Sequence, residues 1–383
     1  MKPYVVFITD FFGPYPGGIE SFHLGLVKFW PDEYIITFFL DSYPEPKKNA
    51  DYEDYLSKTI YHHIIPNRSF KKKNHIKEIV IQLEKLKKEI PIKHILIGNL
   101  YSNIKYLYPF IQGLGIPYSI ILHPVDLEKS PFFHFGLNRF LRESKYIFTY
   151  THYFYELALI NGFPREKLIL IPLGLFARWE HTKDHPVNEN FKTILKKQKD
   201  QFKILTVGPL VKKKHIHRGV FVLEHLIKLI QKENIHWFIA GSGEEFYFLK
   251  ELIHSHNLED YITLLGFLSD KELGMMYFHS DVYFHPGGDG RDPFSGFSIT
   301  LLEAGYSSLP VIAGNGAAIH ELVQNNVTGY IVSYDDFELL SYKIWELYKD
   351  SKLRKKMGRN AEQKVQKEFY IQRSIHNIYE RIM

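Results

Sequence analysis

The amino-acid sequence predicts an α/β protein with two doubly wound, Rossmann-like parallel sheets whose strand ends face each other across a cleft. Short apolar runs such as residues 4–9, YVVFIT, are typical of parallel strands that are buried on both faces. Helical patterns lie between these runs, and glycine-rich loops follow several of them. The polar stretch 179–200 reads as a linker, so we expect a first domain over 1–178 and a second over 201–365.

The first series begins with the strand 4–9 and a helix over 20–30, and the pair Gly17-Gly18 lies between them. A loop between a strand and a helix is where an α/β protein places a ligand. A helix over 71–90 carries lysines opposite its apolar face. This lysine face is suited to anionic lipid, although a solvated surface explains most charge runs. The other strands are expected at 34–40, 61–65, 94–97, 118–122, 146–150 and 168–171.

The second series repeats this alternation, and glycines follow its strands at Gly208, Gly241, Gly243 and Gly266. Glycine allows the backbone to approach a ligand closely. The plain alternative, that these glycines only make turns, accounts for one such loop equally well but less readily for several. Strands are expected at 202–207, 237–240, 262–264, 281–285, 309–313 and 330–332, and helices at 219–231, 245–254, 271–279, 298–306, 337–349 and 353–382.

Composition and charge exclude several classes of protein. The chain has no cysteine, which excludes disulfides, thiolate metal sites and a cysteine nucleophile. No uncharged apolar run reaches the ~18 residues of a membrane span, and Asp10 interrupts the apolar start. The net charge of +5 suits phosphorylated ligands or an anionic membrane surface, without the strong basic stripe of a nucleic-acid-binding protein. We therefore expect a cytoplasmic protein, at most peripheral to the inner face of the cytoplasmic membrane, with no nucleic-acid partner.

Three groups of side chains are candidates for chemistry. His123 and Asp126 follow the strand 118–122, where polar groups meet ligands, although a satisfied loop histidine is the commoner case. Lys214 ends a lysine triplet between a strand and a helix, where it can reach a phosphate; a solubilising surface cluster explains the triplet equally well. Glu303 lies in an apolar helix. Because glutamate is seldom buried without a partner, we expect it to face a ligand or another protein rather than solvent.

Several stretches resemble, in order and spacing, the retaining nucleotide-sugar glycosyltransferases of glycosyltransferase family 4 (glycosyl transferases group 1), which have the GT-B fold. The resemblance covers nearly the whole chain and is strongest over 204–331. It also implies that a last helix, about 366–383, packs back on the first domain. It is carried by ILTVGPLVKKK, FIAGSGEE, ITLLGFLSDKEL, MYFHSDVYFHP, GFSITLLEAGYSSLPVIAGNGAAIHELV and NNVTGYIV, and less specifically by PGGIE and HPVD.

The resemblance implies a role for each residue that matches a family motif. His123 would lie near the donor sugar and the acceptor, Lys214 at the pyrophosphate and Glu303 at the ribose, and these three are the expected catalytic residues. Asp126 and Asp292 are additional candidates. The family implies no metal and no cofactor beyond the nucleotide-sugar co-substrate, and no metal-ligand cluster stands out in the sequence. The residues implied to bind the donor are Gly17, Gly18, Gly208, Lys213, Gly241, Gly243, Gly266, Phe267, Ser295, Gly296, Phe297, Ser298 and Ile299.

Two positions depart from the family pattern. Ser295 replaces a glutamate that usually contacts a donor-sugar hydroxyl. Pro209 replaces an arginine and supplies neither a charge nor an N–H group. Lys212 or Lys213 is a candidate to replace the lost arginine, and Asp292 to replace the lost glutamate.

The expected function is transfer of a sugar, with retention, from a nucleotide-sugar donor to a hydroxyl of a glycan or lipid-linked acceptor, in bacterial surface polysaccharide or glycolipid synthesis. One alternative is a non-catalytic relative that binds nucleotide or glycan as a partner subunit, which the two departures favour. Another is a dinucleotide-dependent oxidoreductase. That class needs a G-x-G-x-x-G loop, and after Gly241-Ser-Gly243 the third glycine is replaced by Phe246.

Overall fold

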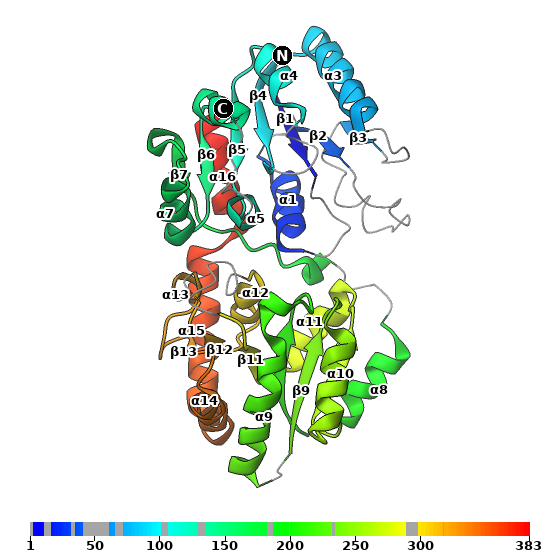
Figure 1. Cartoon of the computed structure of the whole chain (residues 1–383), viewed down its shortest axis with the longest axis vertical. Helices are drawn as coiled ribbons and strands as arrows, with labels where there is room; N and C mark the ends of the chain where they lie inside the picture. The colour runs from blue at the N-terminus through cyan, green and yellow to red at the C-terminus, as the bar shows by residue number, and fades with distance from the viewer. Residues whose placement is uncertain are drawn as a thin grey trace. The chain divides into compact units, whose positions relative to one another are not determined.

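The computed structural model describes residues 3–10, 17–31, 35–40, 61–65, 72–100, 106–128, 135–181, 187–198, 200–231, 234–288, 298–316 and 318–383. The chain divides into two compact units. The first comprises Met1–Phe176 with Phe369–Met383, and the second comprises Ala177–Glu368. Each unit has one parallel sheet with helices packed on it (Figure 1). The prediction of two Rossmann-like sheets is confirmed, and the cleft between them stays a prediction.

In its described part, the first unit forms a seven-stranded parallel sheet with the order β3-β2-β1-β4-β5-β6-β7. The central strand β1 pairs with β2 and β4, so that Phe7 lies opposite Thr37 on one side and Leu96 on the other. Side chains of β1 are buried on both faces, which explains the uninterrupted apolar run. The strands are β1 (Tyr4–Thr9), β2 (Ile35–Leu40), β3 (Tyr61–Ile65), β4 (Ile92–Ile97), β5 (Tyr118–Ile121), β6 (Ile147–Thr149) and β7 (Leu168–Leu170).

The helices of the first unit connect these strands. The helix α7 starts where the Thr151 hydroxyl accepts the N–H of Phe154, a side-chain N-cap. The helix α1 begins at Gly18, with Gly17 directly before it, so the predicted glycine pair forms the start of this helix. The described helices of this part of the chain are α1 (Gly18–Lys28), α3 (Lys72–Glu89), α4 (Tyr108–Gly113), α5 (Pro124–Glu128), α6 (Phe135–Glu143), α7 (His152–Ile160) and the 3-10 turn η3 (Arg165–Lys167).

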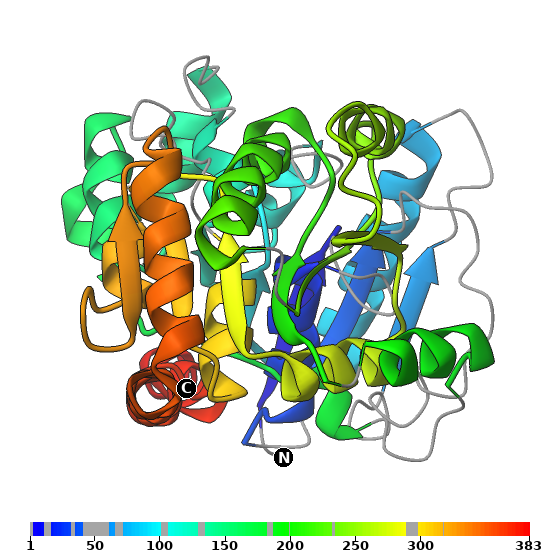
Figure 2. The same ribbon diagram turned by 90° about the horizontal axis from the view of Figure 1, so that it is seen from below.

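The described part of the second unit forms a six-stranded parallel sheet with the order β10-β9-β8-β11-β12-β13. Helices lie on both of its sides (Figure 2). Successive side chains of β11 point to opposite faces of the sheet and meet different helices. Phe284 belongs to the apolar core with helices α9 and α14, whereas the Tyr283 hydroxyl bonds to Thr300 of α12. The strands are β8 (Phe202–Val207), β9 (Ile235–Ala240), β10 (Ile262–Gly266), β11 (Val282–His285), β12 (Val311–Gly314) and β13 (Gly329–Val332).

Most helices of the second unit lie close to their predicted positions, and α8 and α13 are additional. The helix α11 has the strongest start signal, because Ser269 and Glu272 form a reciprocal capping box. The described helices are α8 (Glu189–Lys197), α9 (Ile216–Ile230), α10 (Phe246–Ser255), α11 (Asp270–His279), α12 (Thr300–Tyr306), α13 (Ile319–Leu322), α14 (Phe337–Lys349) and α15 (Ser351–Glu368), with the 3-10 turns η4 (Arg178–His181) and η5 (Lys212–Lys214).

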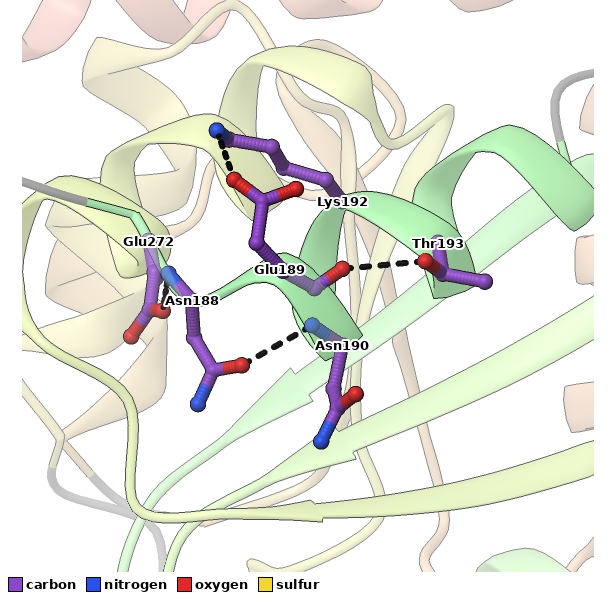
Figure 3. Close-up of polar contacts among 6 residues, drawn as sticks. All are labelled: Asn188, Glu189, Asn190, Lys192, Thr193 and Glu272. Atoms are coloured by element: carbon purple, nitrogen blue, oxygen red, sulfur yellow. Dashed lines mark hydrogen bonds and ion pairs between the residues drawn. The ribbon is translucent and has the colours of Figure 1, made fainter.

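The polar stretch expected as a linker, 179–200, belongs instead to the second unit. It contains the turn η4 and the helix α8, which Asn188 caps by accepting the N–H of Asn190 (Figure 3). The backbone N–H of Asn188 donates to Glu272 of α11 over 2.9 Å. Polar composition was misleading here because most residues of α8 are exposed, and a single buried aromatic, Phe191, together with hydrogen bonds attaches the helix.

The single last helix expected over 353–382 is two helices, α15 and α16 (Ile371–Ile382). They are separated at Phe369 and Tyr370, where Tyr370 adopts an extended conformation and the N–H of Leu175 donates to the carbonyl of Phe369. Helix α16 lies in the first unit beside α1, and the rings of Trp30 and Tyr379 are 5.5 Å apart. Among the residues described, no helix is long and apolar enough to cross a membrane.

Candidate functional site

The strand order of the second unit places a topological switch point between β8 and β11. From β8 the chain runs outward through β9 and β10, then returns to β11 on the other side of β8. In open parallel sheets of this kind, ligands bind beyond the carboxyl ends of the strands at the switch point. Three predicted stretches meet this edge: the loop that starts at Gly208, the lysine turn η5 and the helix α12.

Glycines at this edge allow neighbouring loops to touch through their backbones. A Cβ added to Gly241 would lie 1.9 Å from the carbonyl oxygen of Gly208, and one added to Gly243 would lie 2.3 Å from that of Leu210. Both have positive φ, 149° and 157°. The N–H of Gly241 also donates to the carbonyl of Gly266 over 2.8 Å. These two glycines are therefore needed for loop packing, whether or not a ligand is near.

Gly208 and Gly266 differ from that pair. Both have positive φ, 153° and 69°, but a Cβ added to either would meet no described atom within 4 Å. Space is therefore open beside the backbone at the carboxyl ends of β8 and β10. Phe267, the residue after β10, exposes 62% of its surface. This combination suits close approach of a flat or anionic ligand.

Lys214 ends the turn η5, between β8 and the helix α9. The residue that follows, His215, has a left-handed conformation with φ of 51° and starts α9. Burial, and secondly the positive charge of Lys214, lower the pKa of His285 to about 3. His285 is the last residue of β11, so the Lys214 charge acts at the switch point. The first N–H groups of α9 add a positive dipole end beside it. Lys213 lies in the same turn.

Hydroxyl groups connect the start of α12 to the end of β8. The Ser298 hydroxyl lies 2.7 Å from that of Thr300, which lies 2.5 Å from that of Tyr283. The Tyr283 hydroxyl donates to the carbonyl of Val207 over 3.0 Å. Ile299 precedes the first residue of α12. The predicted residues Ser298 and Ile299 are thus held next to the loop at Gly208.

Glu303 is buried on α12, with 8% of its surface exposed, which excludes the exposed helix position considered as the alternative. The Tyr277 hydroxyl donates to its Oε2 over 2.7 Å. Burial raises the pKa of Glu303 to about 7, and the Tyr277 hydrogen bond and the charge of Arg178 partly oppose this rise. Arg178 is itself paired with Asp270 at 2.7 Å. Glu303 is therefore a carboxyl group that is partly protonated at neutral pH.

The first unit has its own switch point, between β1 and β4. His123 follows β5, and its ring is buried among other rings and side chains rather than open to solvent. Its Nε2 lies 3.0 Å from the Nε2 of His23 on α1. Asp126 accepts the backbone N–H of His123 through one carboxylate oxygen and that of Leu100 through the other. Burial, and secondly His23, hold the pKa of His123 well below its usual range, so this ring is neutral.

Four of the predicted site residues cannot be placed. Ser295, Gly296, Phe297 and Asp292 lie outside the described residues. Gly17 and Gly18 lie at the start of α1. The described residues contain no group of three His, Asp or Glu side chains that is suited to a metal ion.

Sequence reasoning missed His23, Tyr277 and His285. His23 gave a usable signal, because it is a polar residue within the apolar face of the predicted helix over 20–30. The contact of Tyr277 with Glu303 joins residues 26 positions apart, and no local pattern predicts it. His285 ends an apolar strand, and its Nε2 is buried without a hydrogen-bond partner in the described part of the chain.

Comparison with known proteins gives a family match and several relatives. The family described as Glycosyl transferases group 1 matches residues 187–364. The chain is 27% identical over 184 residues to the putative colanic acid biosynthesis glycosyltransferase WcaL of Escherichia coli strain K12, covering 48% of this chain and 42% of that protein. It is 33% identical over 115 residues to the GDP-mannose-dependent alpha-(1-6)-phosphatidylinositol monomannoside mannosyltransferase of Mycobacterium tuberculosis strain H37Rv, covering 29% and 30%. The chain spans about half or less of the length of the curated relatives it matches.

Among solved structures, the chain is similar to Anabaena Alr3699/HepE in complex with UDP and glucose. The TM-score is 0.73 at 16% sequence identity, with 98% of both chains covered. At this identity the likeness shows the fold, which is the predicted GT-B fold.

Proposed function

We propose that the chain transfers a sugar from a nucleotide-sugar donor to an acceptor hydroxyl, because residues 187–364 match the family described as Glycosyl transferases group 1. The observation that carries the proposal is the carboxyl edge of the second sheet. There the Lys214 charge, the start of α9 and the open space beside Gly208 lie at the switch point, and Gly266 adds open space at the end of β10. A nucleoside diphosphate needs these features: a cation, oriented N–H groups and close backbone approach.

On this proposal, catalysis depends mainly on stabilising the leaving group. Breaking the bond between the sugar and the diphosphate places negative charge on a phosphate oxygen. Lys214 and the positive dipole end of α9 oppose that charge, and a preorganised cation in a partly dry site stabilises it more than water does. Lys214 thereby supplies the charge for which many phosphate-handling enzymes use a divalent metal, and we propose a metal-independent reaction that retains the configuration of the sugar.

Glu303 is proposed to bind a hydroxyl group of the donor's ribose. Its carboxyl group is buried and accepts one hydrogen bond from Tyr277. A carboxylate can accept further hydrogen bonds, so a vicinal pair of hydroxyls is a suitable ligand. The cost of keeping this group away from water is the main physical argument against a purely structural role.

The relatives suggest an acceptor class. Their printed names include colanic acid and amylovoran biosynthesis and a phosphatidylinositol mannoside mannosyltransferase. We propose a glycan or lipid-linked acceptor in surface polysaccharide or glycolipid assembly, reached at the inner face of the cytoplasmic membrane. Because Anabaena Alr3699/HepE binds UDP, a uridine nucleotide is the first donor class to test.

The test is nucleoside diphosphate release from a panel of UDP-, GDP-, ADP- and TDP-sugars, with and without lipid-linked acceptors. Acceptor-dependent release with one donor class is expected. Donor binding by calorimetry without release under any condition would replace the proposal with the non-catalytic alternative. Absence of both binding and release would reject it entirely.

A further inference from the structure

A continuous set of buried polar side chains crosses the carboxyl edge of the first sheet. Thr9 ends β1, His23 lies on α1, Asn99 follows β4, His123 follows β5 and Tyr150 follows β6. None exposes more than 5% of its surface. Buried polar groups in such number usually form a satisfied network, and the direction of each hydrogen bond can be worked out from fixed donors.

The backbone fixes the first direction. The N–H of Asp10 can only donate, and it lies 3.1 Å from Oδ1 of Asn99. The amide group of Asn99 is oriented at its other end too, because its Nδ2 lies 3.3 Å from a carboxylate oxygen of Asp10. Oδ1 of Asn99 is therefore an acceptor. The Thr9 hydroxyl, 3.3 Å from that oxygen, donates its proton to it.

The histidines follow from this assignment. Once the Thr9 hydroxyl has donated its proton to Asn99, it accepts from the Nδ1 of His23, 3.1 Å away. A neutral His23 with its proton on Nδ1 has an acceptor at Nε2. The facing Nε2 of His123, 3.0 Å away, then carries the proton of that ring. The remaining nitrogen of His123, Nδ1, is left as an acceptor. The Tyr150 hydroxyl lies 3.4 Å from Nδ1 and 3.5 Å from Nε2, so it is within reach of either nitrogen and does not itself decide the tautomer.

Packing holds the two rings in this arrangement. Their centroids are 4.9 Å apart at an interplanar angle of 75°, and Phe22 lies edge-on to both. Gly98 leaves room for the pair, because a Cβ there would lie 2.8 Å from the Thr9 side chain and 2.9 Å from the His23 ring. Asp126 fixes the backbone of His123 from the opposite direction.

We propose that His23 is a positioning residue for His123: it holds His123 in the Nε2–H tautomer, so that Nδ1 is the one acceptor that this ring can offer. This assignment deepens the proposed function and rests on it for its catalytic meaning. His123 then donates from Nε2 to His23, which joins the end of β5 to α1, and keeps Nδ1 as its acceptor. His23 acts through it and touches no substrate.

The first test needs no activity. In the full-length protein labelled with ¹⁵N in its histidine rings, two-bond correlation spectra identify the tautomer of each ring, and His123→Gln assigns the His123 signals. The expected result is Nε2–H for His123 and Nδ1–H for His23. The reverse tautomer at His123 would overturn the inference, and it would do so whether or not the chain transfers sugars.

The second test uses variants. His23→Phe keeps a ring but removes the acceptor, and we expect a mixed tautomer at His123 and a kcat about 10- to 100-fold lower, with the donor KM within about 3-fold. His23→Gln keeps an acceptor oxygen and should restore most of kcat. The matched control is His94→Phe, a buried histidine of β4 that bonds to Ser119 outside this network. If His94→Phe lowers kcat as much as His23→Phe does, the effect of His23 is structural and the positioning role is overturned.

If His23→Phe fails to fold, Thr9→Val tests the same point. Valine is similar in shape to threonine but lacks the hydroxyl that fixes Nδ1–H on His23. Mixed tautomers at both histidines are expected. A single unchanged tautomer in Thr9→Val would overturn the inference, because the network would then not set the proton positions.

Discussion

Replacing Glu303 with glutamine should make the protein more stable at alkaline pH. Glutamine has the same shape, can still accept the Tyr277 hydrogen bond and carries no charge. The carboxyl group of Glu303 is buried, and its pKa is raised from 4.5 to about 7. A carboxyl group whose pKa is raised by folding binds more protons in the native than in the unfolded state between those two values.

The sign and the size follow from that difference. Because the native state binds the extra proton, the free energy of unfolding falls as pH rises from 4.5 to 7, at up to about 1.4 kcal/mol for each pH unit. Above pH 7 the wild-type protein therefore carries a penalty of about 3 kcal/mol, which the glutamine variant lacks. At or below pH 4.5 both proteins have an uncharged side chain, and their stabilities should be similar.

Urea unfolding of both proteins at pH 4.5 and pH 8 measures this difference. The control is Glu272→Gln, whose carboxylate is also mostly buried. Burial acts to raise its pKa, but hydrogen bonds from Ser269 and Asn188 outweigh burial and lower it. Removing that charge should destabilise the protein at pH 8, the opposite sign. If Glu303→Gln changed stability equally at both pH values, the charge-burial reasoning would be refuted. Loss of donor binding in the more stable Glu303→Gln protein is the expected signature of a ligand-binding carboxylate.

Three further predictions concern the second unit. Lys214→Ala should weaken nucleoside diphosphate binding about 10- to 100-fold by calorimetry, because a charge-assisted hydrogen bond is lost, and Lys228→Ala, an exposed lysine of α9, should not. Gly241→Ala should lower the free energy of unfolding by at least about 1–3 kcal/mol or prevent folding, because its Cβ would collide with a backbone carbonyl. The control is Gly113→Ala, whose Cβ would have free space, and equal melting temperatures of the two variants would contradict the loop packing. Asn188→Ala should cost about 1 kcal/mol in urea unfolding through the lost cap of α8, and an unchanged midpoint would show that α8 is held by other contacts.

The sequence predicted the sheets well because parallel strands are buried on both faces. Runs such as 4–9 and 202–207 lack an alternation of polar and apolar residues, and the ends of each run mark the ends of a strand. Glycines could also be found, since Gly208 and Gly241 follow such runs directly. What the sequence did not separate is their purpose. Gly241 is required by a carbonyl 1.9 Å from its missing Cβ, whereas Gly208 faces open space, and only coordinates distinguish the two.

The errors share one physical cause, which is contact between segments far apart in the chain. Helix spacing over 353–382 is nearly continuous, but a backbone hydrogen bond from Leu175 to Phe369 divides it. The polar stretch 179–200 was taken as a linker, although Asn188 bonds to Glu272 more than 80 positions away. His23 and His123 are 100 positions apart. Local patterns carry no information about such pairs.

The two switch points, built on the same fold, are filled in different ways. In the first unit, Thr9, His23 and His123 occupy the edge with their own side chains and satisfy one another. In the second unit, the corresponding edge keeps space beside Gly208 and places the charge of Lys214 there. A phosphate ligand is suited to the second arrangement, because open space beside the backbone and a lysine charge are what such a ligand requires. Residues 187–364, which match the family, lie in the second unit, so the proposed donor site should be sought there. The network of the first unit holds its sheet edge in one arrangement.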